Sequence, residues 1–159
     1  RVVGARGGRL KWVSDPLAGG DGVLLDETTV SVWDGRLVAC CRIQGFEGRG
    51  SGARYLAWGD GQSWEGGRLW ELEDPGCNAR LVRDLLVHPH SRRARRAGAL
   101  VRLAPPWEEG MSAEVLASFG EGGFGYSDMV LVGRELLVVF ERDRGLWEAT
   151  LPTSGVLGE

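Results

Sequence analysis

The chain has 159 residues, the length of one ordinary domain, and its 43% hydrophobic and 26% charged residues are the balance of a folded globular protein rather than a disordered chain. The formal net charge of -3 gives no support to a nucleic-acid partner or to a role on a charged membrane surface. No apolar run approaches the ~18 residues of a membrane span, so we expect no membrane segment. Residues 1–159 are expected to form a single domain.

Short runs rich in Val, Leu, Trp and Phe follow one another along the chain and are separated by glycines, of which there are 26. No long stretch has the apolar period of a helix, so the pattern predicts an all-β protein. The expected strands, in chain order, are 10–13, 28–33, 36–42, 54–58, 69–71, 80–81, 85–87, 99–103, 114–116, 128–132, 136–140 and 146–150.

Two dipeptides between these strands are typical of tight hairpins. Asp34-Gly35 separates two expected strands, and Gly133-Arg134 separates two others. Short strands at regular spacing with little helix are typical of a sandwich, a barrel or a propeller.

A strand followed by a tight turn and a tryptophan recurs along the chain and favours the propeller. Residues 54–64 show the pattern most clearly, and 5–12 and 102–107 are worn copies that also end in tryptophan. These tryptophans, Trp12, Trp64 and Trp107, lie 52 and 43 residues apart, which is close to the spacing of propeller blades. Because each blade is a four-stranded sheet, 159 residues supply about three blades.

The turn at 57–64 resembles the Asp-box of sialidases, with Ala57 in the place of the motif's serine and the aspartate displaced to Asp60. Other segments resemble further landmarks of this family in the family's order: Asp-Glu-Thr-Thr-Val at 26–30, the Asp-Gly-Arg hairpin and returning strand at 34–42, Asp-Pro-Gly-Cys-Asn at 74–78, the segment 86–92, Gly-Tyr-Ser-Asp at 125–128 and Val-Phe-Glu at 139–141. The set covers nearly the whole chain. It resembles the C-terminal half of a six-bladed sialidase propeller, which implies a partial propeller of about three four-stranded blades.

The resemblance implies a site for the carboxylate that sialic acid carries on its anomeric carbon. Arginine suits such a group because its guanidinium holds a carboxylate in fork geometry. Similarity to the family assigns Arg42 and Arg96 to two of its three carboxylate-binding arginines. Counting forward from His88 gives Arg95 instead. We expect Arg96, because counting back from the following strand preserves the alternation of side chains.

The resemblance also implies that Tyr126 is a nucleophile. A carboxylate nucleophile would be repelled by the substrate's own carboxylate, whereas a neutral phenol would not, and sialidases are the tyrosine exception among retaining glycosidases. A phenol with a pKa of about 10 is a poor nucleophile and requires a neighbouring base. Glu27, in the acidic strand position of the family, is expected to be that base.

Each of these residues also fits a structural role when it is considered alone. Tyr126 could be a core tyrosine, Glu27 a surface strand residue and Arg42 a solvated strand end. Their occurrence together in the order of the family favours the site. The arginines at 92, 93, 95 and 96 could instead form a basic patch or a nuclear targeting signal, and we expect Arg92 and Arg93 to be solvated.

The cysteines and histidines predict no metal site. Cys40, Cys41 and Cys77 lack metal-ligand spacing, and the adjacent pair is expected to point to opposite faces of a strand as small buried residues. His88 and His90 flank a proline without a third ligand, which favours a turn. We expect no metal and no cofactor.

The resemblance implies that a third arginine and an aspartate acid/base come from the N-terminal half of such enzymes. The chain, which begins at Arg1 rather than Met, is therefore expected to be the C-terminal part of an exo-α-sialidase and nearly inactive alone. The implied substrates are sialylated glycoproteins, gangliosides and oligosaccharides. Two alternatives are a non-catalytic sialic-acid-binding or glycan-binding propeller segment and a propeller that binds proteins, in which Tyr126, Glu27 and the arginines would be scattered.

Overall fold

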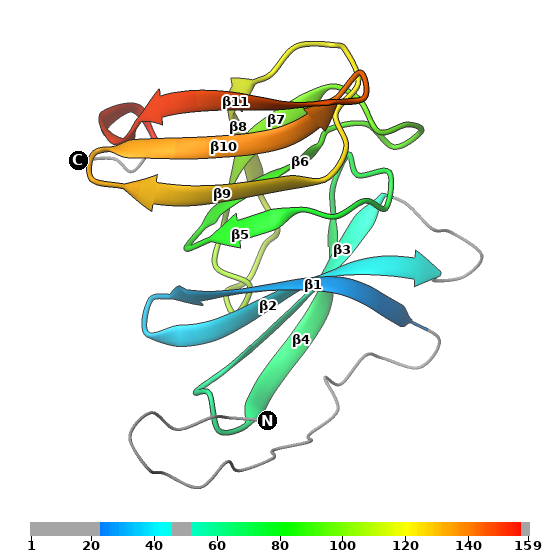
Figure 1. The fold of residues 1–159 in the computed structure, drawn as a ribbon. Coiled ribbons are helices and arrows are strands. Elements are labelled where there is room, and N and C mark those ends of the chain that lie inside the picture. Colours follow the sequence, from blue (N-terminus) through cyan, green and yellow to red (C-terminus); the bar gives the residue numbers. More distant parts are fainter. Residues whose placement is uncertain (1–22, 46–51, 157–159) are drawn as a thin grey trace, which may run out of the picture.

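The computed structural model describes residues 23–45 and 52–156, which form three antiparallel β-sheets (Figure 1). A single turn of 3-10 helix at Thr153–Gly155 follows the last strand, and the described residues contain no α-helix. The prediction of an all-β protein is therefore confirmed. The expected strand at 10–13 and the first tryptophan turn lie outside the described residues.

Each sheet is a meander in which neighbours in the sequence are neighbours in the sheet. The first sheet has the order β1-β2-β3-β4, the second β5-β6-β7-β8, and the third β11-β10-β9. The bounds of the strands are β1 Leu24–Trp33, β2 Arg36–Gly45, β3 Ala53–Gly59, β4 Trp64–Glu71, β5 Arg80–Val82, β6 Leu85–Pro89, β7 Gly98–Leu103, β8 Ala113–Ser118, β9 Ser127–Val132, β10 Glu135–Arg142 and β11 Gly145–Pro152.

Two-residue turns set the register of the hairpins. Asp34 and Gly35 have φ of 49° and 73°, the left-handed values that a type I′ turn requires, and they connect β1 to β2 as predicted. Gly133, with φ of 61°, opens the predicted turn between β9 and β10. Asp143 and Arg144 form a third turn of this kind, with φ of 51° and 65°, between β10 and β11. Neither of its two central residues is glycine, so the dipeptide rule does not predict this third turn.

The three sheets are stacked on one another (Figure 1). Two clusters of buried side chains lie between them. Leu56 and Trp70 of the first sheet pack with Leu81 and Leu86 of the second, and all four are fully buried. Burial of a large apolar side chain contributes about 1.5–3 kcal/mol. The first strands of successive sheets also contact each other: β1 lies against β5, and β5 lies against β9.

The two described tryptophan turns both lie between the third and fourth strands of their sheets. Trp64 follows the link between the third and fourth strands of the first sheet, and Trp107 lies in the corresponding link of the second. In the first link, Asp60 Oδ1 accepts hydrogen bonds from the backbone N–H groups of Gln62 at 2.7 Å and Ser63 at 2.8 Å. The Asp60 side chain thus stabilises the turn that precedes Trp64.

The three cysteines are buried and free. Cys40 packs in the layer between the first two sheets, whereas Cys41 packs on the opposite face of β2, as the alternation predicted. The expectation of a turn at His88 is wrong. His88 and Pro89 belong to β6, and His88 is fully buried.

Candidate functional site

Tyr126 lies in the loop that leads into β9, with 37% of its surface exposed. The loop is held against β10 by two backbone hydrogen bonds, from Gly125 N to Glu141 O at 2.9 Å and from Glu141 N to Tyr126 O at 3.0 Å. Next to the tyrosine, Phe124 is buried and stacks on Phe140 with 4.5 Å between ring centroids. The exposed phenol is therefore carried by a firmly packed backbone.

The glycine segment before Tyr126 is held by Arg142. Its Nε donates to Gly123 O at 3.1 Å, and its Nη2 donates to Phe119 O at 2.6 Å. Gly98 of β7 provides the room for Phe124, since a Cβ at that position would lie 1.9 Å from the phenylalanine ring. The absence of a side chain at Gly98 thus permits the packing beneath the tyrosine loop.

Glu27 lies at a β-bulge in β1. Asp26 pairs with Arg42 and Thr28 pairs with Cys41, so Glu27 has no partner on β2. A bulge places an extra residue in one strand and changes the direction of its side chain. Asp26 Oδ1 accepts a hydrogen bond of 2.8 Å from the Glu27 backbone N–H. The irregularity turns the Glu27 carboxylate toward Tyr126.

Tyr126, Glu27 and Arg42 form one hydrogen-bonded group. The Tyr126 hydroxyl donates to Glu27 Oε1 at 2.6 Å, and Arg42 Nη1 donates to Glu27 Oε2 at 2.8 Å. The two bonds use different oxygens of one carboxylate and so fix its orientation. Three predicted site residues, from β1, β2 and the loop before β9, are therefore brought together.

The charges of this group determine where its proton lies. Burial raises the pKa of Glu27, but the hydrogen bonds from Tyr126 and Arg42 outweigh it, so the pKa lies below its usual value. The hydrogen bond to Glu27 and the charge of that carboxylate raise the pKa of Tyr126. The hydrogen bond to Glu27 likewise raises the pKa of Arg42. At neutral pH a neutral phenol donates to an ionised carboxylate.

The structure places Arg95, rather than Arg96, beside Tyr126. The Arg95 guanidinium carbon lies 5.2 Å from the centroid of the Tyr126 ring. Arg96 Nη2 instead lies 3.7 Å from Glu121 Oε2 at an exposed position. The alternation argument for Arg96 fails because Ala97 has a φ of 53°, which interrupts the extended chain before β7.

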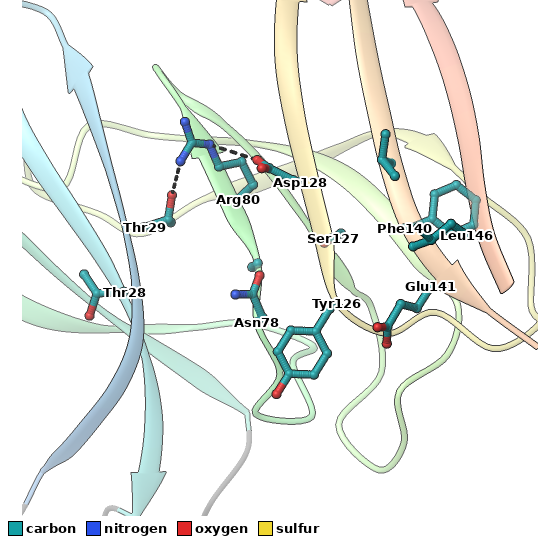
Figure 2. A pocket seen from close by; sticks show the side chains of 12 residues that line it. Thr28, Thr29, Asn78, Arg80, Tyr126, Ser127, Asp128, Phe140, Glu141 and Leu146 are labelled. Carbon is teal, nitrogen blue, oxygen red and sulfur yellow. Dashed lines mark hydrogen bonds and ion pairs between the residues drawn. The ribbon is translucent and has the colours of Figure 1, made fainter. Parts of the chain in front are cut away.

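An open pocket of about 340 Å³ lies beside Tyr126, between β1, β5, β9 and β10 (Figure 2). Arg80 spans it, with Nη1 donating to Thr29 Oγ1 at 3.3 Å and Nε lying 3.3 Å from Asp128 Oδ1. Figure 2 shows Asn78 next to Tyr126 at the same pocket. A second pocket of about 480 Å³ includes Arg95, and Glu141 and Leu146 line both pockets. The tyrosine is therefore next to a concave surface that has both polar and apolar side chains.

A buried polar chain beside this site was missed from the sequence. Arg54, Asp74 and His88 are almost completely buried, with Arg54 Nε 3.3 Å and His88 Nδ1 3.1 Å from Asp74 Oδ2. A signal was present, because Arg54 alternates with Leu56 and Trp58 and so lies on the core-facing side of β3. A charged residue on that face needs a buried partner.

Residues 23–45 and 52–156 hold no group of three or more His, Cys, Asp or Glu side chains that could bind a metal ion. That part of the chain also holds no helix with the length and apolar character to cross a membrane.

A comparison with models of protein families found no match to this chain, and no curated protein matches it. The arrangement of Tyr126, Glu27 and the arginines, together with the resemblance of the sequence to sialidases, is therefore the basis for a functional proposal.

Proposed function

We propose that this chain is part of a retaining exo-α-sialidase in which Tyr126 is the nucleophile and Glu27 its base. The observation that carries the proposal is the 2.6 Å hydrogen bond between the Tyr126 hydroxyl and Glu27 Oε1, formed by residues 99 positions apart. A nucleophile and a base within hydrogen-bond reach, with the base oriented by a third group, is the arrangement that activated nucleophiles require. Arg42 is that third group.

The proposed first step transfers the sugar to the enzyme. The Tyr126 oxygen attacks the anomeric carbon, the bond from that carbon to the leaving oxygen breaks, and the phenolic proton passes to Glu27. The leaving oxygen takes a proton from the aspartate acid/base that the resemblance implies in the N-terminal half of such enzymes. Water then attacks the anomeric carbon of the tyrosyl intermediate and gives its proton to that aspartate, the bond to the Tyr126 oxygen breaks, and the proton on Glu27 returns to the phenol oxygen. The raised pKa of Tyr126 keeps the phenol neutral as the anionic substrate approaches.

Arg95 is the proposed main contact for the substrate's carboxylate. It is exposed, lies over the Tyr126 ring and lines the second pocket. Arg42 Nη1 donates a hydrogen bond to Glu27, so the proposed first role of Arg42 is to orient the base. Its remaining N–H donors are proposed to contact the carboxylate of the substrate. Arg96 is proposed only as a secondary contribution to positive charge, because it pairs with Glu121.

We propose further that the three sheets are consecutive blades of a six-bladed propeller. Support comes from the two four-stranded meanders, from the contacts between successive first strands, and from the matching positions of Trp64 and Trp107. In this proposal the aspartate acid/base and the third arginine lie in other blades. The isolated chain would then bind sialylated glycoproteins, gangliosides or oligosaccharides weakly and turn them over poorly.

The experiment is hydrolysis of a fluorogenic α-sialoside by this chain and by any longer form of the protein that contains it. Tyr126→Phe should abolish turnover in the longer form and leave binding of N-acetylneuraminic acid largely intact. Turnover that survives Tyr126→Phe would remove Tyr126 from the mechanism. Binding without turnover in every form would favour the glycan-binding alternative.

A further inference from the structure

A chain of polar side chains connects the buried centre of the molecule to the loop that carries Arg95. Arg54 of β3 and His88 of β6 both lie against Asp74 Oδ2, at 3.3 Å and 3.1 Å. His90 continues the chain, with its Nδ1 3.4 Å from His88 Nε2 and the two rings edge to face. Arg54, Asp74 and His88 are at most 1% exposed, whereas His90 reaches the half-buried base of the loop.

The protonation of this chain follows from Asp74. Burial raises the pKa of Asp74, but the charge of Arg54 and the hydrogen bond from His88 outweigh it, so the carboxyl is ionised. An ionised carboxylate only accepts, so His88 carries its hydrogen on Nδ1. Burial lowers the pKa of His88, which leaves the ring neutral with Nε2 as an acceptor. His90 must therefore donate from Nδ1, and each bond has one direction.

The series of polar contacts from Asp74 through His88 to His90 ends at the loop 90–97. The His90 backbone N–H donates to Ala97 O at 3.0 Å and closes the loop at its base. Between these residues, Arg95 O accepts a hydrogen bond of 2.9 Å from Phe124 N, and the Arg95 guanidinium lies over Tyr126. The segment 92–96 is exposed, so its position depends on these attachments rather than on burial.

The same buried charges hold the segment that leads to Asn78. Asp74 Oδ1 accepts a hydrogen bond of 2.7 Å from Gly76 N, and the Arg54 guanidinium donates to Cys77 O. The next residue, Asn78, lines the pocket beside Tyr126. The Arg54–Asp74 ion pair thus holds the backbone segment before Asn78. Through His88 and His90 it also holds the base of the loop that carries Arg95.

We propose that the Asp74–His88–His90 chain is a positioning device that holds the Arg95 guanidinium over Tyr126. His90 is a positioning residue in this account, because it acts through the loop and touches no substrate. The use of Arg95 to bind a carboxylate rests on the proposed function, whereas the positioning itself does not.

The test measures the NMR signal of the Tyr126 ring and needs no ligand. The protein has two tyrosines, so isotope-labelled tyrosine gives only two sets of ring signals. Tyr126→Phe identifies the Tyr126 signal, and the buried Tyr55 reports whether each variant is folded. Arg95→Ala should move the Tyr126 signal, because it removes the cation next to the ring. His90→Ala should move it in the same direction. His90→Asn retains an N–H donor near the position of Nδ1 and should restore the original signal.

A double variant that combines His90→Ala with Arg95→Ala shows whether His90 affects the Tyr126 signal through Arg95 or independently of it. If His90 acts through Arg95, His90→Ala adds no further shift in the Arg95→Ala background. An unchanged Tyr126 signal in His90→Ala, an additive shift in the double variant, or no response to Arg95→Ala would each overturn the proposal. Failure of N-acetylneuraminic acid to bind would overturn the proposed function alone, since these NMR comparisons involve no sugar.

Discussion

Glu27 and Tyr126 meet because β1 is irregular at one position. Glu27 is the residue of β1 that has no partner between the Asp26–Arg42 and Thr28–Cys41 pairs, and its Oε1 accepts the 2.6 Å hydrogen bond from Tyr126. The contact joins the first sheet to the loop that opens the third. A bulge changes the direction of a side chain in its strand, and this one directs the Glu27 carboxylate toward the Tyr126 phenol.

Glu27→Gln should lower the pKa of Tyr126. The hydrogen bond to the Glu27 carboxylate and its negative charge raise that pKa above the usual value of about 10, and a neutral amide removes the charge while Arg95 and Arg42 remain. Ultraviolet absorbance of tyrosinate measures the shift against pH, with Tyr126→Phe to assign the signal. Asp26→Asn is the matched control because Asp26 has no described hydrogen bond to the phenol. Equal titrations of Glu27→Gln and the native chain would contradict the contact.

Asp74→Asn should destabilise the fold strongly. It leaves the buried Arg54 guanidinium without its counter-charge, and removal of one partner of a buried pair costs about 3–5 kcal/mol. Glu73→Gln, which breaks an exposed pair with Arg92, should cost about 0–1 kcal/mol. Urea unfolding of both variants measures the difference in the free energy of unfolding. Similar losses for the two variants would show that the buried pair does not have this role.

The stability of the fold should fall in acid because of His88 and Asp74. Burial holds the pKa of His88 below its usual value, so the unfolded chain takes up that proton first and stability declines as the pH drops below about 6.5. Asp74 acts in the same direction at lower pH. Although burial raises its pKa, the charge of Arg54 outweighs this, and its contribution is lost below about pH 3.9.

The urea midpoint at pH 7 and pH 5 tests the histidine part of this prediction. His88→Asn keeps a donor for Asp74 but cannot take up a proton, so its midpoint should change less between the two values than that of the native chain. An equal change in both proteins would assign the acid sensitivity to other groups.

Gly98→Ala should disturb the packing under the tyrosine loop. The new Cβ would lie 1.9 Å from Phe124, a ring confined by Phe119 and Phe140, so the ring must move. Overpacking of this kind costs about 1–3 kcal/mol. Gly155→Ala is the control, because its Cβ would meet no atom within 4 Å. The comparison of urea midpoints should show a loss at Gly98 alone, and a neutral Gly98→Ala would mean that the loop packs differently.

Much of the fold could be predicted because the local rules agreed. Alternating apolar residues and glycine-containing turns located the strands, and Asp34-Gly35 and Gly133-Arg134 gave two of the hairpins. The sequence predicts a strand that begins at Thr28, whereas β1 begins at Leu24 and includes the polar Asp26 and Glu27. These two residues interrupt the apolar pattern and lie at the bulge beside Tyr126.

The arginines and the buried ion pair were harder to predict because their positions depend on the assembled sheets. The choice between Arg95 and Arg96 depended on regular alternation, which the left-handed conformation of Ala97 breaks. A turn is expected at His88 because Pro89 follows it, whereas Asp74, in the link between β4 and β5, provides the partner of the buried His88 ring. The partners in each contact, Asp74 with His88 and Arg95 with Tyr126, are far apart in the sequence, so local sequence patterns do not predict that they meet.

The most direct measurement is covalent trapping with a sialic acid that carries fluorine at its anomeric carbon and at the neighbouring carbon. Fluoride leaves without protonation, so the step does not depend on the acid/base that the resemblance places elsewhere, and Tyr126, Glu27 and the arginines of this chain are tested alone. Mass spectrometry of the chain should show one added sugar on the peptide that contains Tyr126, and Tyr126→Phe should abolish it. An adduct on another residue, an adduct unchanged in Tyr126→Phe, or no adduct in a chain that binds the sugar would contradict a tyrosine nucleophile at this position.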